Sequence, residues 1–568
     1  MKNTNNILPK ILPLSVVGDD INITVKSLLI LGIALVNYVL LFGRLKIGTY
    51  GGVYSYGITG LFSIALVLLT IFLGIYTKKT LKYSYIAIFY LVLLFFVPQI
   101  FANLPIFPYV YRIYGHIDYI LHTGHIHPEA PRLGYQTWPG AMFLGVILVI
   151  ISKIGLYTLL TLPVLSYLIN VPIFYLLLKD LTKDQRKAVI GVLFWITAGY
   201  GFGWFVPGVL ATYLEMVGIY VLFKLYSGKL KINKNFSEFW GILMLLTLTL
   251  IFTHLLTSIF WAITIMIFLI LSVVTNDKKI QTLNMVLLTI FIILEFYWIF
   301  THTYALYLFK SRVRYLLALF SGALKATDKW TSVAQTGLTQ HAEILRIKAY
   351  FMYSIVGASL AGMLIVIAGS LKKLIKTRKI DRIVLLLVLL LIFYSIGVST
   401  IAGSYSGEIP SRLFGGSKYI FVIFFTLALK NPKFGRAAIM VLFIFSYLHV
   451  LCTYGNMAYD YVAPNEITGM YYTSTNIQSK FYTIPDALWD MEYLKKDEQY
   501  ILPITLLLKN DNITGGIVVV SSRRIDGYRF FTGKELGLTS IRIKSSKIYC
   551  SDNQYTNVPS KFEIYYWG

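Results

Sequence analysis

Long apolar runs separated by short polar segments make up most of the first 452 residues of the chain. Runs of about 20 residues can cross a hydrocarbon core of roughly 30 Å as helices, and these lack the alternating period of barrel strands. The pattern therefore predicts an all-α polytopic membrane protein. Its expected spans, about 13 in number, lie at residues 27–43, 59–76, 85–101, 157–178, 188–205, 207–225, 240–253, 257–275, 283–309, 349–370, 383–403, 418–429 and 436–452.

Lysine and arginine gather in the short polar segments between apolar runs, for example at Lys78 and Lys79, 229–234, 372–382 and 430–436. Such clusters mark the cytoplasmic side of a membrane. We therefore expect a multi-pass protein of the cell membrane with its amino terminus inside and its carboxy terminus outside. The apolar stretch 139–152 would reverse this order if it crossed, so it is interpreted as a re-entrant or surface-lying helix.

Composition supports the membrane class and narrows the partners. Hydrophobic residues make up 57% of the chain and charged residues 14%, which excludes an ordinary water-soluble fold. The net charge of +25 sits at predicted membrane surfaces, with no basic stripe interleaved with aromatic residues, so no nucleic-acid partner is expected. Many isoleucine, lysine and tyrosine residues with only two cysteines are typical of an archaeal source.

The tail has a different character from the rest. Residues 1–452 form the expected transmembrane domain, and residues 453–568, where polar residues return, form an expected external α/β domain. Within it, Gly515 to Val520 reads as a buried strand followed by a polar turn. Cys452 and Cys550 both fall on the external side, where a disulfide and two free thiols are both open interpretations.

One polar island stands out in the predicted external loop 102–156. Four of the eight histidines lie between His116 and His127, beside Asp118. Ionisable groups near a bilayer are costly and usually serve a function. On a helix, Asp118 and His122 share a face, so Asp118 is a candidate general base and His122 a group that orients it or donates to a leaving phosphate. The alternative is that both only cap and solvate a loop helix.

The same island raises the question of a metal. Imidazole and carboxylate ligands suit Zn²⁺ or Mn²⁺, but no strong ligand spacing is present, so a solvated loop is the competing interpretation. No cofactor is therefore certain, and a divalent metal is left open. The residues concerned are His116, Asp118, His125, His127 and Glu129.

The island also carries a family resemblance. An acidic residue, then a histidine, a glycine and an aromatic-Pro-Gly entering an apolar helix resembles the C-type (GT-C) superfamily of membrane glycosyltransferases. The matching residues are Asp118, His122, Gly124, Tyr135, Trp138, Pro139 and Gly140. The layout is similar as well, with a basic turn at 179–187, an external aromatic stretch at 199–205, a His-x-x-Thr-Ser at 254–258, Arg412 in the last outer loop, and an external tail.

The resemblance implies transfer of a sugar from a polyprenyl-phosphate carrier, dolichyl phosphate in archaea and eukaryotes, to a protein, lipid or glycan acceptor on the external face. The chain looks more like the hexosyltransferase-type, monosaccharide-transferring branch of protein O-mannosyltransferases and the lipid A aminoarabinose transferase. It lacks the Trp-Trp-Asp-x-Gly motif of oligosaccharyltransferases, and a single Asp118 replaces the usual acidic pair.

A departing phosphate needs a cation, and arginine binds phosphate bidentately. Candidates are Arg312, Arg314, Arg346, Lys348 and Arg412, with Arg412 favoured by the family layout; a lone arginine at a helix end is otherwise an interfacial side chain. The expected substrate-binding set is Arg412, Arg312, Arg314, His254, Tyr135 and Trp138.

Polar residues inside the predicted spans leave a further alternative open. Glu215, His254, Glu295 and His302 either line a carrier cavity or pair between helices. A transporter or flippase for a lipid-linked or anionic substrate is the second functional hypothesis, and a scaffold that displays the tail is the third. Large outer loops and an external tail, set against compact cytoplasmic turns, favour the enzyme.

Overall fold

The computed structural model describes most of the chain. The described residues are 18–48, 50–75, 79–102, 108–126, 136–153, 155, 162–199, 207–226, 232–320, 343–378, 381–402, 409–455, 457, 462–476, 481–483, 501–503, 516–521, 525–526, 529, 545–553 and 560–567.

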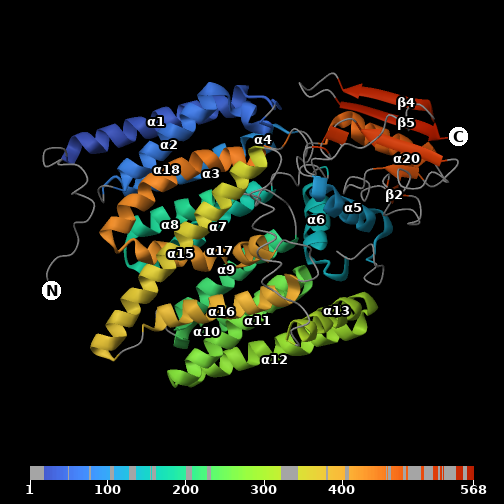
Figure 1. Cartoon of the computed structure of the whole chain (residues 1–568). Helices are drawn as coiled ribbons and strands as arrows, with labels where there is room; N and C mark the ends of the chain where they lie inside the picture. Colours follow the sequence, from blue (N-terminus) through green and yellow to red (C-terminus); the bar gives the residue numbers. More distant parts are fainter. Residues whose placement is uncertain are drawn as a thin grey trace.

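A bundle of long helices forms the body of the molecule (Figure 1). Each of the predicted spans overlaps at least one of them, and among the described residues seven helices are by themselves long and apolar enough to cross a membrane. The chain is therefore a polytopic, helical membrane protein. The bundle consists of α1 (Gly18–Phe42), α2 (Gly57–Gly74), α3 (Leu81–Phe95), α7 (Leu162–Thr182), α8 (Gln185–Thr197), α9 (Pro207–Tyr226), α10 (Ile232–Thr253), α11 (Leu255–Val274), α12 (Lys278–Thr301), α15 (Glu343–Thr377), α16 (Arg382–Ala402), α17 (Ile409–Ala428) and α18 (Pro432–Tyr454).

Short turns join neighbouring helices at one end of the bundle, which we call the basic end. Two residues separate α7 from α8, and three separate α17 from α18. The Asp184 carboxylate accepts from the backbone N–H of Arg186 at 2.9 Å, and the Asn431 side chain caps α18 in the same way. Asp277 caps α12. These side chains satisfy backbone donors that a helix start leaves unpaired, so each of them fixes where the second helix of its turn begins.

The other end, which we call the polar end, carries smaller elements. Helices α5 (Pro108–Thr123), α6 (Gly140–Ser152) and α20 (Pro464–Asn476) lie there together with the strands (Figure 1). At 13 residues, α6 is shorter than a crossing helix, and the side chains of Ile150 and Ile151 on it are exposed. Its placement as a re-entrant or surface-lying helix stays a prediction. The remaining short helices are η2 (Gly52–Tyr56), α4 (Val97–Phe101) and α13 (Thr303–Phe320).

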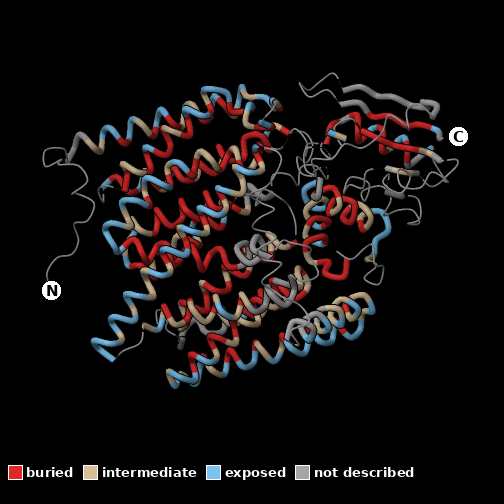
Figure 2. The backbone as a smooth tube through the Cα atoms, in the orientation of Figure 1, coloured by how far each residue is buried: buried red, intermediate tan, exposed pale blue. Residues whose placement is uncertain are grey.

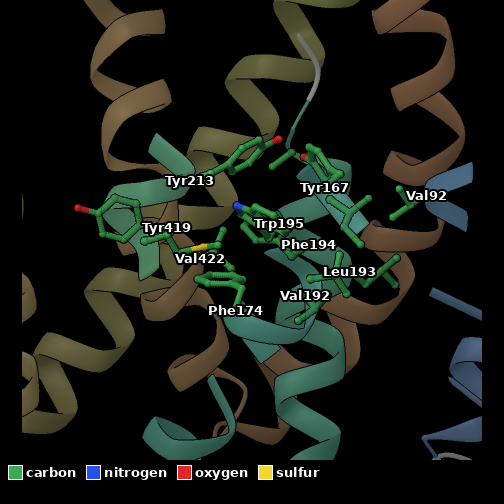
Figure 3. Packing of buried hydrophobic residues seen from close by; sticks show 14 of the residues in the cluster. Val92, Tyr167, Phe174, Val192, Leu193, Phe194, Trp195, Tyr213, Tyr419 and Val422 are labelled. Carbon is green, nitrogen blue, oxygen red and sulfur yellow. The ribbon is translucent and has the colours of Figure 1, made fainter. Parts of the chain in front are cut away.

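The core of the bundle is aromatic and continuous. Tyr167 and Phe174 of α7 and Tyr213 of α9 gather around Trp195 of α8 (Figure 3). The Tyr167 and Trp195 rings stack with centroids 4.9 Å apart. Buried positions concentrate where helices meet, whereas the outward faces of α1, α12 and α15 are largely exposed (Figure 2). Exposed apolar faces on the outside of a bundle are suited to contact with lipid.

In the part of the tail that the structure describes, the strands form a five-stranded mixed sheet in the order β2-β1-β3-β5-β4. Strands β1, β2 and β3 are parallel neighbours, and β5 pairs antiparallel with both β3 and β4. The predicted strand at 515–520 is β3, and its Val518 and Val519 are fully buried. The strands are β1 (Phe481–Thr483), β2 (Ile501–Pro503), β3 (Gly516–Ser521), β4 (Ser545–Asn553) and β5 (Ser560–Trp567).

Helix α20 packs against this sheet. A Cβ at Gly469 would lie 2.1 Å from the Phe562 ring of β5, so glycine permits the close approach. The Glu466 carboxylate accepts from the Ser521 hydroxyl at 2.6 Å and from the Ala463 N–H at 2.8 Å. The division of the chain into domains at residue 453 stays a prediction.

Two details of the sequence interpretation change. The predicted span 283–309 is interrupted, because α12 ends at Thr301 and α13 starts at Thr303, with His302 in an extended conformation between them. Residues 310–320 are therefore helical and do not begin a loop. Cys452 is a free, buried thiol, which favours the second of the two cysteine interpretations, while the side chain of Cys550 lies outside the described part.

Candidate functional site

Helix α5 has one packed face and one polar face. Tyr111, Tyr114 and Ile117 recur every three residues and are fully buried. Asp118 and His122, four residues apart, lie on a more exposed face. The helix ends at Gly124, whose φ of 76° is a left-handed conformation that favours glycine. The spacing of apolar residues thus holds the polar pair at the surface of the polar end.

Asp118 and His122 are in direct contact. The His122 Nδ1 atom lies 3.2 Å from the Asp118 Oδ1 atom and 2.8 Å from the Asp118 carbonyl oxygen. With its proton on Nδ1, the imidazole donates to these oxygens and holds the carboxylate in one orientation. The Asp118 side chain is 19% exposed and that of His122 is 64% exposed. The predicted proximity is therefore present, and its catalytic role stays a prediction.

His116 is the buried member of the island. Its side chain is fully buried, and the Gln136 Nε2 amide donates to its Nδ1 atom at 3.4 Å. Burial, reinforced by the nearby Arg112 guanidinium, lowers the pKa of His116 to about 3. The ring is therefore neutral at pH 7 and serves to join α5 to residue 136, the start of the segment that leads into α6.

That segment, 136–140, is fastened to two bundle helices. The Trp298 indole N–H of α12 donates to the Thr137 carbonyl oxygen at 2.7 Å. A Cβ at Gly140 would lie 2.7 Å from the Thr253 Oγ1 atom and 3.0 Å from the Phe252 carbonyl oxygen, so α6 starts in close contact with α10. Trp138 is buried between these contacts. The glycine of the aromatic-Pro-Gly motif is therefore needed for packing.

His254 marks the turn between α10 and α11. It is the N-cap of α11, and its Nδ1 atom lies 3.0 Å from the Thr257 hydroxyl and 3.4 Å from the Thr257 backbone N–H. A Cβ at Gly208 of α9 would lie 3.3 Å from its ring. Ser258, one turn further along, is fully buried and near the Glu295 carboxyl of α12. The His-x-x-Thr-Ser motif thus faces α9 and α12 at the polar end.

A second cluster surrounds Lys418, which the sequence analysis did not select. Lys418 is 2% exposed, and its Nζ atom lies 5.5 Å from the centre of the Trp195 ring. A Cβ at Gly199 would lie 2.7 Å from the same Nζ and 1.8 Å from the Tyr167 hydroxyl. His449 of α18, whose Nδ1 donates to the Thr197 carbonyl oxygen at 2.8 Å, belongs to the same cluster.

The first turns of α9 touch both clusters. Gly208 meets the His254 ring, and Tyr213, five residues later, packs edge-on to Tyr167 at 5.9 Å. Five helical residues rise about 7.5 Å, so these two contacts are about that far apart along α9.

Lys418 had a signal in the sequence: it begins an apolar run at the predicted external end, where the charge rule does not place lysine.

The structure does not test every predicted site residue. Tyr135, His127 and Glu129 lie outside the described residues. Arg312 lies in α13 and Arg412 in α17, but their side chains are also outside that part, while Arg314 is exposed on α13. Among the described residues, no three His, Cys, Asp or Glu side chains group as metal ligands do.

Comparison with known proteins gives a weak structural likeness. The crystal structure of ArnT from Cupriavidus metallidurans bound to undecaprenyl phosphate is 11% identical, with 87% of this chain and 99% of that chain covered and a TM-score of 0.37. The apo state of the same protein is 11% identical, with 86% and 98% covered and a TM-score of 0.39. No protein-family model matches the sequence, and no curated protein matches it. The likeness assigns no activity to this chain.

Proposed function

We propose that this protein is a membrane glycosyltransferase. It moves a sugar from a polyprenyl-phosphate carrier to an acceptor hydroxyl at the polar end of the bundle, with Asp118 as the base. The observation that best supports this is the contact between Asp118 and His122 on α5, at the end of a lipid-embedded bundle. A lipid-linked donor needs such a place, because its chain stays in the hydrocarbon while its sugar must meet a polar acceptor.

The chemistry assigns one role to each member of the pair. Asp118 takes the proton of the acceptor hydroxyl as that oxygen attacks the anomeric carbon of the sugar, and the bond from this carbon to the phosphate oxygen breaks. The electron pair leaves with polyprenyl phosphate. His122 keeps the Asp118 carboxylate in place through its Nδ1–H. Positioned acid–base groups of this kind typically contribute 10²–10⁴-fold to rate.

The leaving phosphate needs positive charge. Among the described lysines, Lys418 is the buried one, and it lies at the polar end. Its Nζ atom and the Tyr167 hydroxyl both lie close to Gly199. A cation out of water interacts with a phosphate more strongly than one on the surface. Lys418 therefore joins Arg412, Arg312 and Arg314 as a candidate to hold the phosphate, and His254, Tyr135 and Trp138 remain candidates for donor contact.

The proposed orientation places the polar end outside the cell. The basic end contains the lysine-rich turns, which suits the cytoplasmic surface. Labelling an introduced cysteine at exposed Thr123 from outside intact cells tests this directly. A label that reaches the site only after lysis contradicts the orientation.

The activity is tested with purified protein in lipid nanodiscs. Synthetic polyprenyl-phosphate monosaccharides and hydroxyl acceptors are supplied, and released polyprenyl phosphate is measured by mass spectrometry. Release that requires an acceptor, and that is lost in Asp118→Asn, supports the proposal. The matched control is Asp277→Asn, because asparagine caps a helix about as well as aspartate at the basic end.

The transporter hypothesis makes the opposite prediction in the same preparation. Sealed proteoliposomes would move the carrier or its head group across the bilayer without forming a covalent product. Such movement, combined with no transfer to any acceptor, overturns the glycosyltransferase.

A further inference from the structure

We infer that Glu295 binds hydroxyl groups of the sugar that the lipid carrier holds, and so selects a glycosylated carrier over a bare one. The inference rests on the proposed function, because it assigns the head-group contact of the same site.

Glu295 is a buried carboxyl whose hydrogen bonds are not used within the described part of the chain. Its side chain is 5% exposed, and neither Oε1 nor Oε2 has a hydrogen bond there. The Ser258 side chain is close enough to interact with the Glu295 carboxyl, but its single hydroxyl proton is directed at the Leu255 carbonyl oxygen at 2.8 Å, so it completes no hydrogen bond to either Glu295 oxygen. Leaving a buried carboxyl without donors costs several kcal/mol in general, which suggests that a ligand supplies them.

The position of Glu295 is fixed by its own helix. Trp298, three residues later on the same face of α12, donates to the Thr137 carbonyl oxygen at 2.7 Å. Residue 136 in turn reaches His116 of α5. This chain of contacts connects Glu295 to the helix that carries Asp118, and it places both carboxyls at the polar end.

The neighbours of Glu295 suit a sugar better than a cation. Ser258 of α11 brings a hydroxyl close to the Glu295 carboxyl, and His254 lies one helical turn before Ser258 on the same helix. Among the described residues, no three His, Cys, Asp or Glu side chains group as metal ligands do. A carboxyl group offers two oxygens side by side, and two adjacent hydroxyls of a sugar can hydrogen-bond to them as a pair. A divalent cation would need more oxygen ligands than this region offers.

The test compares two ligands that differ only in the sugar. Binding of bare polyprenyl phosphate and of polyprenyl-phosphate hexoses of the same chain length is measured for wild type, Glu295→Gln, Glu295→Asp and a matched control in nanodiscs. The control is Glu343→Gln, because Glu343 is an exposed carboxyl at the polar end of α15. Glu295→Gln keeps the volume of the side chain. Glu295→Asp keeps the carboxyl group and serves as the second variant if Glu295→Gln does not fold.

We expect wild type and Glu343→Gln to prefer at least one hexose-bearing lipid, and Glu295→Gln to lose about tenfold or more of that preference while binding bare polyprenyl phosphate as wild type does. Three outcomes overturn the inference: no preference in wild type, an unchanged preference in the variant, or equal loss for both lipids. Wild-type sugar preference without any transfer overturns the glycosyltransferase and leaves the inference standing. Transfer by the wild type, combined with an unchanged preference in Glu295→Gln, overturns the inference and leaves the glycosyltransferase standing.

Discussion

Two buried carboxyls in the bundle differ in how the protein around them is arranged. Glu215 of α9 accepts from the Tyr394 hydroxyl of α16, and the Tyr419 hydroxyl of α17 lies 3.3 Å from the same oxygen. Thr264 of α11 lies 2.8 Å from the Tyr394 hydroxyl, so four helices meet at this one network. Glu295 has no such network in the described part of the chain.

The difference separates a structural role from a binding role for the same residue type. Around Glu215, tyrosine hydroxyls from α16 and α17 reach Oε1 and join those two helices to α9, which is the expected use of a polar group inside a bundle. Around Glu295, the neighbouring hydroxyl is committed to the backbone, and both carboxyl oxygens stay available. We therefore expect changes near Glu215 to alter stability, and changes at the polar end to alter transfer.

The largest expected effect is at Asp118. Asp118→Asn removes the proton acceptor and leaves the fold, so transfer should fall about 10²–10⁴-fold while donor binding stays within about twofold. Single-turnover rates with saturating donor check this, with Asp277→Asn as the control. A variant that keeps its rate removes Asp118 from the base role.

The Glu215 network should respond in stability. Tyr394→Phe removes the donor to Glu215, and we expect the free energy of unfolding to fall by about 1–3 kcal/mol with little change in transfer per folded molecule. Thermal unfolding followed by intrinsic fluorescence measures the change in stability, and transfer rates normalised to the amount of folded protein measure the change in activity. Tyr297→Phe, at an exposed tyrosine on α12, is the control and should change neither. A Tyr394→Phe variant with full stability and lost activity would contradict the structural role assigned to the Glu215 network and would give that network the role assigned to the polar end.

Stability should also depend on pH through His116. The pKa of His116 is about 3 in the folded chain, below the 6.5 of an exposed histidine, so between these values the unfolded chain binds a proton that the folded chain does not. Stability is then lost as pH falls below about 6.5, by about 2 kcal/mol at pH 5. Unfolding midpoints at pH 7 and pH 5 should lie closer together in His116→Asn than in wild type. His125→Asn, at an exposed histidine, should leave their separation unchanged.

The smallest effect is expected at His122. His122→Ala frees the Asp118 carboxylate to rotate but keeps the base, so transfer should fall only about two- to tenfold. His125→Ala is the control on the same segment, and it should leave the rate unchanged. A fall in His122→Ala as large as that in Asp118→Asn contradicts a merely orienting role and makes the imidazole a proton carrier.

Much of the fold could be predicted from the sequence because apolar runs and their polar boundaries are local signals. The basic turns at 179–187 and 430–436 marked helix ends, and the aspartate and asparagine caps lie in such turns. The break at His302 was missed, since the apolar run continues through it into α13. Hydropathy alone does not resolve a helix interruption of one residue.

The site could be predicted only in part, for a physical reason. The pairing of Asp118 with His122 follows from helical spacing, and the structure contains it. The contacts of Thr137 with Trp298, and of Gly140 with Thr253, join residues more than a hundred positions apart, so no local pattern announces them. Lys418 illustrates the same limit, because its burial depends on Trp195 of α8 and on Gly199, just beyond the end of that helix.

The capped turns at the basic end have a mechanical consequence. Only two or three residues connect the helices there, and Asp184 and Asn431 fix the first turns of α8 and α18, so the short connections keep adjacent helix ends together. Any widening of the bundle must then be a fanning motion that pivots on these turns. The displacement grows with distance from the pivot, so it is greatest beside α5, and the opposite surface stays undisturbed.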